Sequence, residues 1–463
     1  MATQILTSTY NNSNVLDKIY SSTLTYPLSE TNNDQYLNLY CFLSGIKPWA
    51  DETNPPDIIY SDFFKKTLHK NIFILKQITP FDLSAVIERI DWVTGTIYSR
   101  YNDLVDMFEL DAYNKLVRKF YVRNSYDQIF KCIWNGESIV NTLGVLSTVE
   151  PKILPGNNLT DIIDTGDGYK WKYLYTIDPT QKFKFFDQSW IPLSIQSYKT
   201  DISGSSIGFG TLDSINVINS GNNYVTDLTG GTTTSITITG DGVGATAIGI
   251  VESNKLSKIS ILTSGSGYTY ANCSISASGA YSGANAAAII SISPISGTGV
   301  DLYSELGVRT ALVSCTFTGS ESGIIPTDIS YRQVGLISNP NLVGGGFANS
   351  SIYSTATLIN TSSGGTFVNG ERVFQGSLEN QTFCADVLSF DPTRNLLYVI
   401  NTINVPIQSL NIQGVTSGSF SQVLAVTNPN ISIGSGKILY LENVTPIQRS
   451  EFSSEQFRLA LNF

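Results

Sequence analysis

Apolar and polar residues alternate along much of the chain, with the period of two that is expected of half-buried β-strands. The alternation is clearest between residues 201 and 298, where Ile and Val recur at every second position between Gly-rich turns. Shorter segments rich in Ile, Val, Phe, Tyr and Trp and bounded by turn formers predict strands at 72–78, 85–92, 120–122, 129–133 and 171–177. The pattern predicts a mainly β protein.

One segment, 56–70, has the pattern of a short amphipathic helix. It starts with Pro56 and Asp57 and carries Lys residues in its second half, the arrangement that favours helix initiation and termination. The single histidine, His69, falls here. A zinc site or a catalytic triad needs further partners, so we expect a histidine on a helix face.

Part of the alternating region repeats itself. Residues 212–224 return as 256–268, which makes Tyr224 equivalent to Tyr268. The stretch from Ile236 to Ala245 returns between Cys273 and Ala284, at a shift near 39. Two copies of one β unit explain this pattern better than a flexible Gly/Ser linker, which would not keep the period of two. A second block, 351–435, has short strands at intervals of about ten residues, the spacing of a small barrel or sandwich.

Composition removes several function classes. The chain has 463 residues, a net charge of −10 and only 14% charged residues, which argues against binding to nucleic acid. The densest basic run, 115–123, is interleaved with apolar residues and is expected to lie on solvated edges of strands or helices. No apolar run approaches the ~18 residues of a membrane span, and the N-terminus has no signal-peptide pattern, so neither membrane insertion nor secretion by that route is expected.

The five cysteines are widely spaced and form no CxxC pair, which favours free, mostly buried thiols. The matches to catalytic motifs are weak. Gly204–Gly208 fits G-x-S-x-G without the strand and helix that a nucleophile elbow needs, and Gly240–Gly244 fits a β-turn better than a phosphate loop.

Two carboxylate groups, Asp161/Asp164/Asp167 and Asp51/Glu52/Asp57, leave polysaccharide hydrolysis open, but both lie in turn-rich segments where Asp is common. We therefore predict a protein that is not an enzyme, with no catalytic, cofactor-binding or metal-binding residues.

Three segments carry a family resemblance: GDGYKWKYLYTI (166–177), YRQVGLISNP (331–340) and ILYLENVTPIQRSEFSSEQFRLALNF (438–463). In this order they resemble the baseplate wedge subunit, the eighth-gene product, of T-even-type contractile-tailed phages, with a cyanobacterial-phage relative as the expected source. Segments that fit the same pattern are Lys47-Pro48-Trp49, Val86–Trp92 and the predicted pair of strands that contains Val122 and Phe130–Cys132. The order of the matches is more specific than any one of them.

The resemblance implies a mainly β protein with a small α/β part that is not an enzyme. The sequence pattern adds β-sandwich or barrel-like modules, so a multi-domain fold is expected. The resemblance divides the chain into a discontinuous core, 1–200 with 300–350 and 436–463, and two inserted modules, 201–298 and 351–435. It also implies a structural protein of the virion, synthesised in the bacterial cytoplasm and placed in the tail baseplate. There it would form a homodimer and bind other wedge subunits during virus assembly.

An alternative hypothesis is a carbohydrate-binding or carbohydrate-cleaving tail protein that contacts the host surface. It rests on the Ser/Thr/Asn/Gly-rich modules and on Tyr224 and Tyr268, which are expected to be exposed and able to stack on sugar rings, although each could equally cap the core of its module.

Two patterns of alternating residues predict parts of the core. Tyr169, Trp171, Tyr173 and Tyr175 alternate onto one face of a predicted strand, which favours core over an assembly contact. Alternating apolar residues near the C-terminus, up to Phe463, predict a buried final strand.

Overall fold

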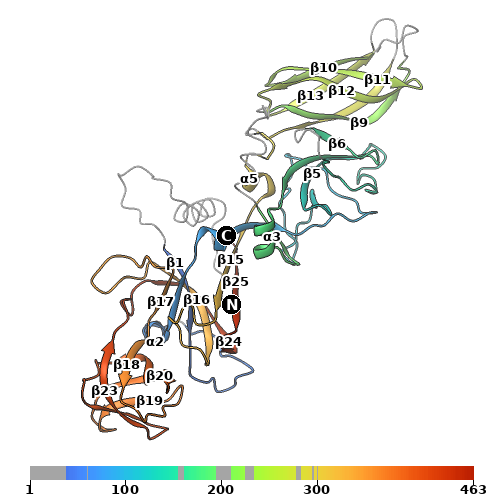
Figure 1. The fold of residues 1–463 in the computed structure, drawn as a ribbon. Helices are drawn as coiled ribbons and strands as arrows, with labels where there is room; N and C mark the ends of the chain where they lie inside the picture. Colours follow the sequence, from blue (N-terminus) through green and yellow to red (C-terminus); the bar gives the residue numbers. More distant parts are fainter. Residues whose placement is uncertain are drawn as a thin grey trace. The chain divides into compact units, whose positions relative to one another are not determined.

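The structure is a computed structural model, and it describes residues 38–59, 61–154, 161–193, 210–224, 234–277, 283–294, 297–299 and 301–462 (Figure 1). The chain forms two compact units. The first combines Met1–Ser84 with Ala311–Phe463, and the second is Ala85–Thr310.

A five-stranded antiparallel sheet organises the first unit. Its strands, in spatial order, are β17 (Ile352–Ser354), β2 (Ile74–Gln77), β1 (Leu39–Ser44), β16 (Ile329–Ser338) and β24 (Lys437–Arg449). Every residue of β1 is buried. Cys41 belongs to the apolar cluster on one face of the sheet and Phe42 to the cluster on the other, so apolar material covers both faces.

Helix α2 (Asp62–Asn71) packs Leu68 into one of these clusters. The predicted helix is confirmed, but its predicted start at Pro56 is wrong. The Ser61 hydroxyl accepts a hydrogen bond from Phe64 N at 3.1 Å, which caps the helix at that point. A short 3₁₀ turn, η1 (Pro80–Asp82), follows β2.

The chain ends in strand β25 (Ser454–Asn462), which lies next to β15 (Thr310–Thr318). The predicted strand is confirmed, but its predicted full burial is wrong. Phe457, Leu459 and Leu461 are only partly buried against the core because, among the described strands, β25 has a neighbour on one side only. Phe463 lies outside the described residues.

A closed six-stranded barrel completes the first unit. Around the barrel the order is β18 (Thr357–Thr361), β21 (Leu396–Ile403), β20 (Gln381–Asp391), β19 (Arg372–Gly376), β22 (Asn411–Gly414) and β23 (Phe420–Thr427). Strand β18 pairs with both β21 and β23, which closes the ring around a core that includes Ile359, Phe383 and Val399.

The second unit contains a four-stranded sheet of β4 (Tyr121–Arg123), β5 (Gln128–Asn135), β7 (Tyr169–Thr176) and β6 (Ile162–Asp164). The aromatic residues of β7 from Tyr169 to Tyr175 are all at most 5% exposed, so their predicted role in the core is confirmed. Residues of β3 (Leu83–Glu88) from Val86 onward pair with β8 (Trp190–Pro192), and the helices are α3 (Pro179–Phe185) and α5 (Leu302–Leu306).

The other side of β7 meets the repeat region. Lys170 Nζ donates to Asn216 Oδ1 at 2.6 Å, and Lys172 Nζ lies 3.4 Å from Asp213 Oδ1. Burial lowers the pKa of Lys170. The repeat region is therefore packed against this sheet and is not a detached appendage.

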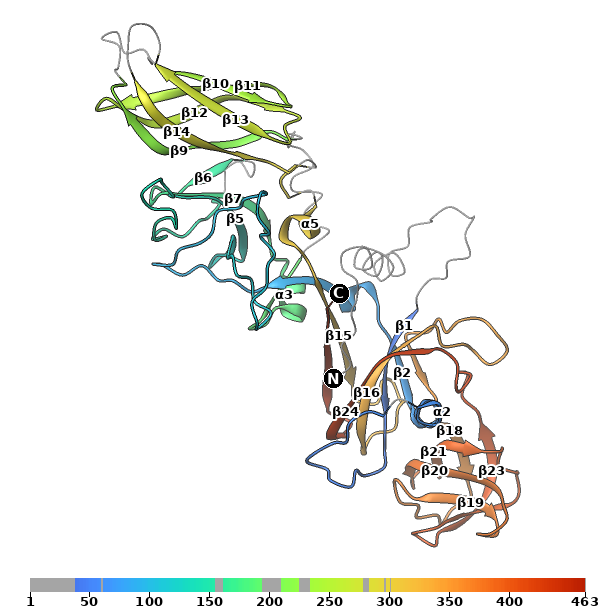
Figure 2. The same ribbon diagram turned by 180° about the vertical axis from the view of Figure 1, so that it is seen from behind.

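The repeat region is a six-stranded module, seen from behind in Figure 2. Its strands are β9 (Leu212–Asn222), β10 (Thr234–Gly240), β11 (Val243–Glu252), β12 (Lys255–Ser266), β13 (Ala271–Ala277) and β14 (Ala284–Ile292). The first strand of each copy pairs with the last strand of the other copy, β9 with β14 and β12 with β11. The middle strands β10 and β13 pair with each other. The two copies therefore interlock about an approximate two-fold axis.

The ends of this module lie together, as expected of an inserted segment. Leu212 pairs with Ile292, and Ser293 N donates to Thr211 O at 2.9 Å. The chain therefore enters and leaves the module at one place.

The predicted fold class is confirmed: the protein is mainly β, with several antiparallel sheets, a closed barrel and a small helical part. The predicted division into a core and two inserted modules stays a prediction. The predicted core segment 1–200 is divided between Ser84 and Ala85, and each predicted module lies within one unit.

Candidate assembly surfaces

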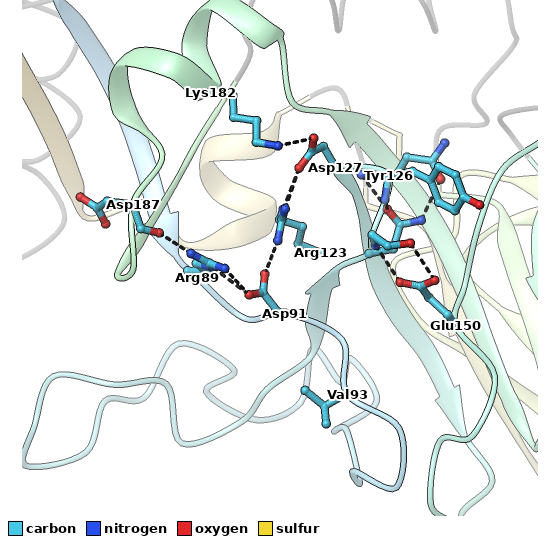
Figure 3. Close-up of polar contacts among 12 residues, drawn as sticks. Arg89, Asp91, Val93, Arg123, Tyr126, Asp127, Glu150, Lys182 and Asp187 are labelled. Carbon is cyan, nitrogen blue, oxygen red and sulfur yellow. Dashed lines mark hydrogen bonds and ion pairs between the residues drawn. The ribbon is translucent and has the colours of Figure 1, made fainter.

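Five charged side chains of the second unit form a continuous chain of ion pairs (Figure 3). Arg89 and Asp91 are 2.6 Å apart, and Asp91 is also 2.6 Å from Arg123. Arg123 then lies 2.8 Å from Asp127, which in turn lies 2.8 Å from Lys182. This network ties strand β4, the turn before β5 and helix α3 to the segment that follows β3.

The ring of Phe186, at the C-terminal end of α3, lies beneath three of these cations. The guanidinium carbons of Arg89 and Arg123 are 4.5 and 4.6 Å from the ring centroid, and Lys182 Nζ is 5.7 Å away. Burial raises the pKa of Asp91, but its hydrogen bonds to Arg89 and Arg123 outweigh burial and leave the pKa below its ordinary value.

The pKa of Asp127 behaves in the same way. Burial raises it, and the contacts with Lys182 and Arg123 lower it further than burial raises it. Both carboxylates are therefore ionised at neutral pH, and all five charges have a partner. The network has the properties of a rigid support and offers no free acid or base.

Beside this support, two loops present apolar side chains to solvent. Val93, Ile97, Leu146 and Val149 are between 43% and 56% exposed, and we call these four residues the loop surface. The loops are joined in register, because Gly95 N donates to Ser147 O and Ser147 N donates to Thr96 O. The same segment also exposes Ile139, Val140 and Leu143.

Buried and half-buried polar groups hold the backbone of the loop surface in place. Trp92 Nε1 donates to Ser147 Oγ at 3.0 Å. Asp167 accepts from the backbone N–H groups of Thr148 and Val149 at 2.7 and 2.9 Å. A fixed backbone that carries exposed apolar side chains is typical of a preorganised contact surface, because little conformational entropy remains to be lost on binding.

The barrel carries a second surface of this kind, on the loop between β21 and β22. Gln375 is 1% exposed, donates to the carbonyl oxygens of Ile407 and Leu410, and accepts from Ile407 N at 2.7 Å. Meanwhile Val405, Ile407 and Leu410 remain 62%, 50% and 47% exposed. A buried amide thus fixes a loop whose apolar side chains face solvent.

The candidate carboxylates have structural contacts. Asp51 accepts from Thr53 N at 2.9 Å, Glu52 pairs with Arg332 at 2.6 Å, and Asp164 accepts from Gly166 N at 3.0 Å. Asp161 also has a partner, and Asp57 is exposed. The structure therefore gives Asp51, Glu52 and Asp164 local structural contacts, and none of the named acids lines either of the two described pockets.

The other sequence motifs also have structural positions. Gly240–Gly244 forms the β10–β11 turn, and Gly204–Gly208 lies outside the described residues. His69 is half-buried on α2, as predicted, and burial lowers its pKa. In the basic run, Lys115, Arg118 and Arg123 pair with acids.

The expected exposure of Tyr224 and Tyr268 is wrong. They are 1% and 4% exposed, and each ring packs against glycines of its module. Tyr224 N donates to Asn254 O and Tyr268 N donates to Gly210 O, so equivalent bonds fix both residues. These rings cap the module core and cannot stack on a sugar.

All five cysteines are free thiols, and four of them are buried, which confirms the prediction. Within the described part of the chain, no group of three or more His, Cys, Asp or Glu residues could hold a metal ion. In the same residues no helix is long and apolar enough to cross a membrane.

The chain matches no protein-family model and no curated protein sequence.

The loop surface could not be predicted directly from the sequence, because apolar residues between turn formers do not show which of them face solvent. The available signal was the number of Val, Leu and Ile residues in turn-rich segments, where the pattern predicted no strand.

Proposed function

We propose that this chain is a structural subunit of a baseplate wedge in a contractile phage tail. It would act by homodimerisation and by docking to neighbouring wedge subunits. Its place of action would be the virion, after synthesis in the bacterial cytoplasm, and it would act without an enzymatic step.

The position of the resemblance segments in the fold supports this proposal. GDGYKWKYLYTI forms the turn into β7 and that strand, which has a neighbour on each side. YRQVGLISNP covers most of β16, and the C-terminal segment begins in β24, with Tyr331 opposite Ile447. Strands β7 and β16 lie inside their sheets, whereas β24 and β25 are edge strands. Strands β16 and β24 pair with each other although they are far apart in the sequence.

The loop surface is the observation that carries the proposed mode of action. Exposed apolar side chains on a hydrogen-bonded backbone are costly in an isolated chain and favourable when a partner covers them. We assign the loop surface to the homodimer contact and the barrel loop around Val405 to a neighbouring subunit.

Light scattering on the purified full chain tests the dimer. We expect wild type at twice the 50.4 kDa chain mass. The double variant Ile97→Ser/Leu146→Ser should be monomeric with unchanged unfolding, whereas the control Val243→Ser/Leu262→Ser, on exposed sites of the repeat module, should stay dimeric. A strictly monomeric wild type would contradict homodimerisation. A double variant that remains dimeric would show that the loop surface is not the dimer contact.

A further inference from the structure

The second unit has a groove of about 350 Å³ between the loop after β3 and the repeat module. Its volume is within the range of roughly 300 to 1,000 Å³ that is usual for small-molecule sites. One wall is the segment 100–104 together with part of β5, and the other is formed by 269–273 and 288–292 of β13, β14 and the turn before β13. The groove therefore exists only because the module packs on the sheet.

An aromatic platform stands in this groove. The side chain of Tyr270 is 59% exposed, in contrast to the buried Tyr268 two residues before it. Asp241 fixes the backbone beneath the ring, because it accepts from Thr269 N at 2.9 Å and from Tyr270 N at 3.2 Å. An exposed aromatic face on a fixed backbone suits a ligand with an apolar face of its own.

Polar groups with unused hydrogen-bonding capacity line the same groove as Tyr270. Asp103 and the side chain of Asn272 have no hydrogen-bond partner among the described residues, and both are exposed. Asn102 uses Oδ1 to accept from Leu104 N, which leaves its Nδ2 available. Together they offer acceptors and donors, as recognition of neighbouring hydroxyl groups requires.

The cations that line the groove are already neutralised. Lys131 lies 2.8 Å from Glu305, with both side chains 2% exposed, and its Nζ is 3.6 Å from the centroid of the Tyr101 ring. Arg100 lies 2.7 Å from Glu137. Because no unpaired cation is among the described residues that line the groove and Asp103 adds a negative charge, an anionic ligand is disfavoured.

We infer that this groove binds a neutral carbohydrate, with a sugar ring stacked on Tyr270 and its hydroxyl groups bonded to Asp103, Asn102 and Asn272. This site is distinct from Tyr224 and Tyr268, and it does not depend on the baseplate proposal.

The test is direct binding of the full chain to an array of neutral oligosaccharides built from glucose, galactose, mannose and N-acetylglucosamine, with sulfated oligosaccharides as a second arm. For the strongest neutral binder, Tyr270→Ala should weaken binding about tenfold, since the ring supplies the apolar contact. Asp103→Ala should also weaken it. Tyr126→Ala is the matched control, because Tyr126 is 58% exposed in the same unit and lies outside the groove.

Binding that survives Tyr270→Ala, or an array on which no neutral oligosaccharide binds, would overturn the inference. Stronger binding to the sulfated arm would overturn the assignment to a neutral ligand. Circular dichroism of each variant shows whether a loss of binding is a loss of fold, and Asp103→Asn provides a second variant that keeps the shape of the side chain.

Discussion

Ile236 and Ile275 occupy the same position in the two sequence repeats and lie opposite each other across strands β10 and β13. A residue that pairs with its own equivalent lies on the axis that relates the two copies. The same relation exchanges Tyr224 with Tyr268 and Gly210 with Asn254, so each tyrosine N–H binds the carbonyl group supplied by the other copy. Neither copy completes its sheet alone.

The tyrosine caps should therefore matter equally to the module. Each of Tyr224→Ala and Tyr268→Ala is expected to lower the free energy of unfolding by about 3 to 5 kcal/mol, as for other large buried aromatic side chains. Denaturant unfolding of the full chain, followed by hydrogen exchange of the module strands, measures this.

The matching Phe variants separate the ring from its hydroxyl group. Ala245 N donates to the hydroxyl oxygen of Tyr268 at 3.3 Å, so Tyr268→Phe should cost about 1 kcal/mol. No such bond is formed by the Tyr224 hydroxyl among the described residues, so Tyr224→Phe should be close to neutral. Equal costs for the two Phe variants would contradict this assignment.

Removal of the module should leave the rest of the chain folded. Because Thr211 and Ser293 are hydrogen-bonded, a short Gly/Ser link can replace the residues between them without strain. The deletion also removes Asp213 and Asn216 from Lys172 and Lys170, so some stability should be lost.

We expect a cooperative unfolding transition and retained dimerisation in this deletion variant. A second deletion variant also carries Lys170→Ser and Lys172→Ser, which replaces the two lysines that lose their partners in the module. Loss of cooperative unfolding in both variants would show that the module is an integral part of the second unit.

The ion-pair network predicts a specific effect of Arg123. Arg123→Ala should destabilise the chain at pH 7 by about 2 kcal/mol, less than the 3 to 5 kcal/mol of a fully buried pair, because Asp91 is partly screened by solvent. The stability of Arg123→Lys should lie between that of wild type and that of Arg123→Ala. One ammonium group cannot match a guanidinium that contacts both Asp91 and Asp127.

The pH dependence follows from the same contacts. The folded-state pKa values of Asp91 and Asp127 lie below the unfolded value of about 3.9. Their stabilisation is therefore present above that pH and lost as pH falls through the folded-state values. Urea unfolding from pH 7 to pH 3 should show a smaller acid loss in Arg123→Ala than in wild type; an identical acid loss would contradict the assignment.

Gln375 provides a test of the barrel loop. Gln375→Ala leaves Ile407 N and two carbonyl groups without their partner, and should cost about 2 kcal/mol while speeding hydrogen exchange at Ile407. Gln375→Glu keeps the acceptor and loses the donor, so Ile407 N should stay protected. Unchanged exchange in Gln375→Ala would show that the loop is fixed by other contacts.

Much of the fold could be predicted from local pattern. The alternating apolar side chains along 212–292 and the aromatic side chains of β7 both lie in the core. A period of two places these side chains on one face of each strand. The exposure of Tyr224 could not be predicted, because it depends on a strand from the other repeat that covers the ring. Helix α2 starts later than the predicted Pro56 because the Ser61 hydroxyl group caps it at Phe64 N.

The candidate surfaces were less predictable. Asp167 looked like a turn-forming acid, and it is one, but its contacts with Thr148 and Val149 come from a loop about twenty residues earlier. Likewise, the groove at Tyr270 arises from packing between segments that are far apart in the sequence. Local periodicity does not predict solvent exposure or the pairing of segments that are far apart in the sequence.

The most direct test of the central claim is to locate the chain in virus particles. A tagged copy should be produced in host cells infected with a phage that lacks its own copy, and the purified particles examined by electron microscopy with a gold-labelled antibody. We predict label at the tail baseplate and restored infectivity, both reduced in Ile97→Ser/Leu146→Ser. Particles with complete baseplates that carry no label would contradict the account.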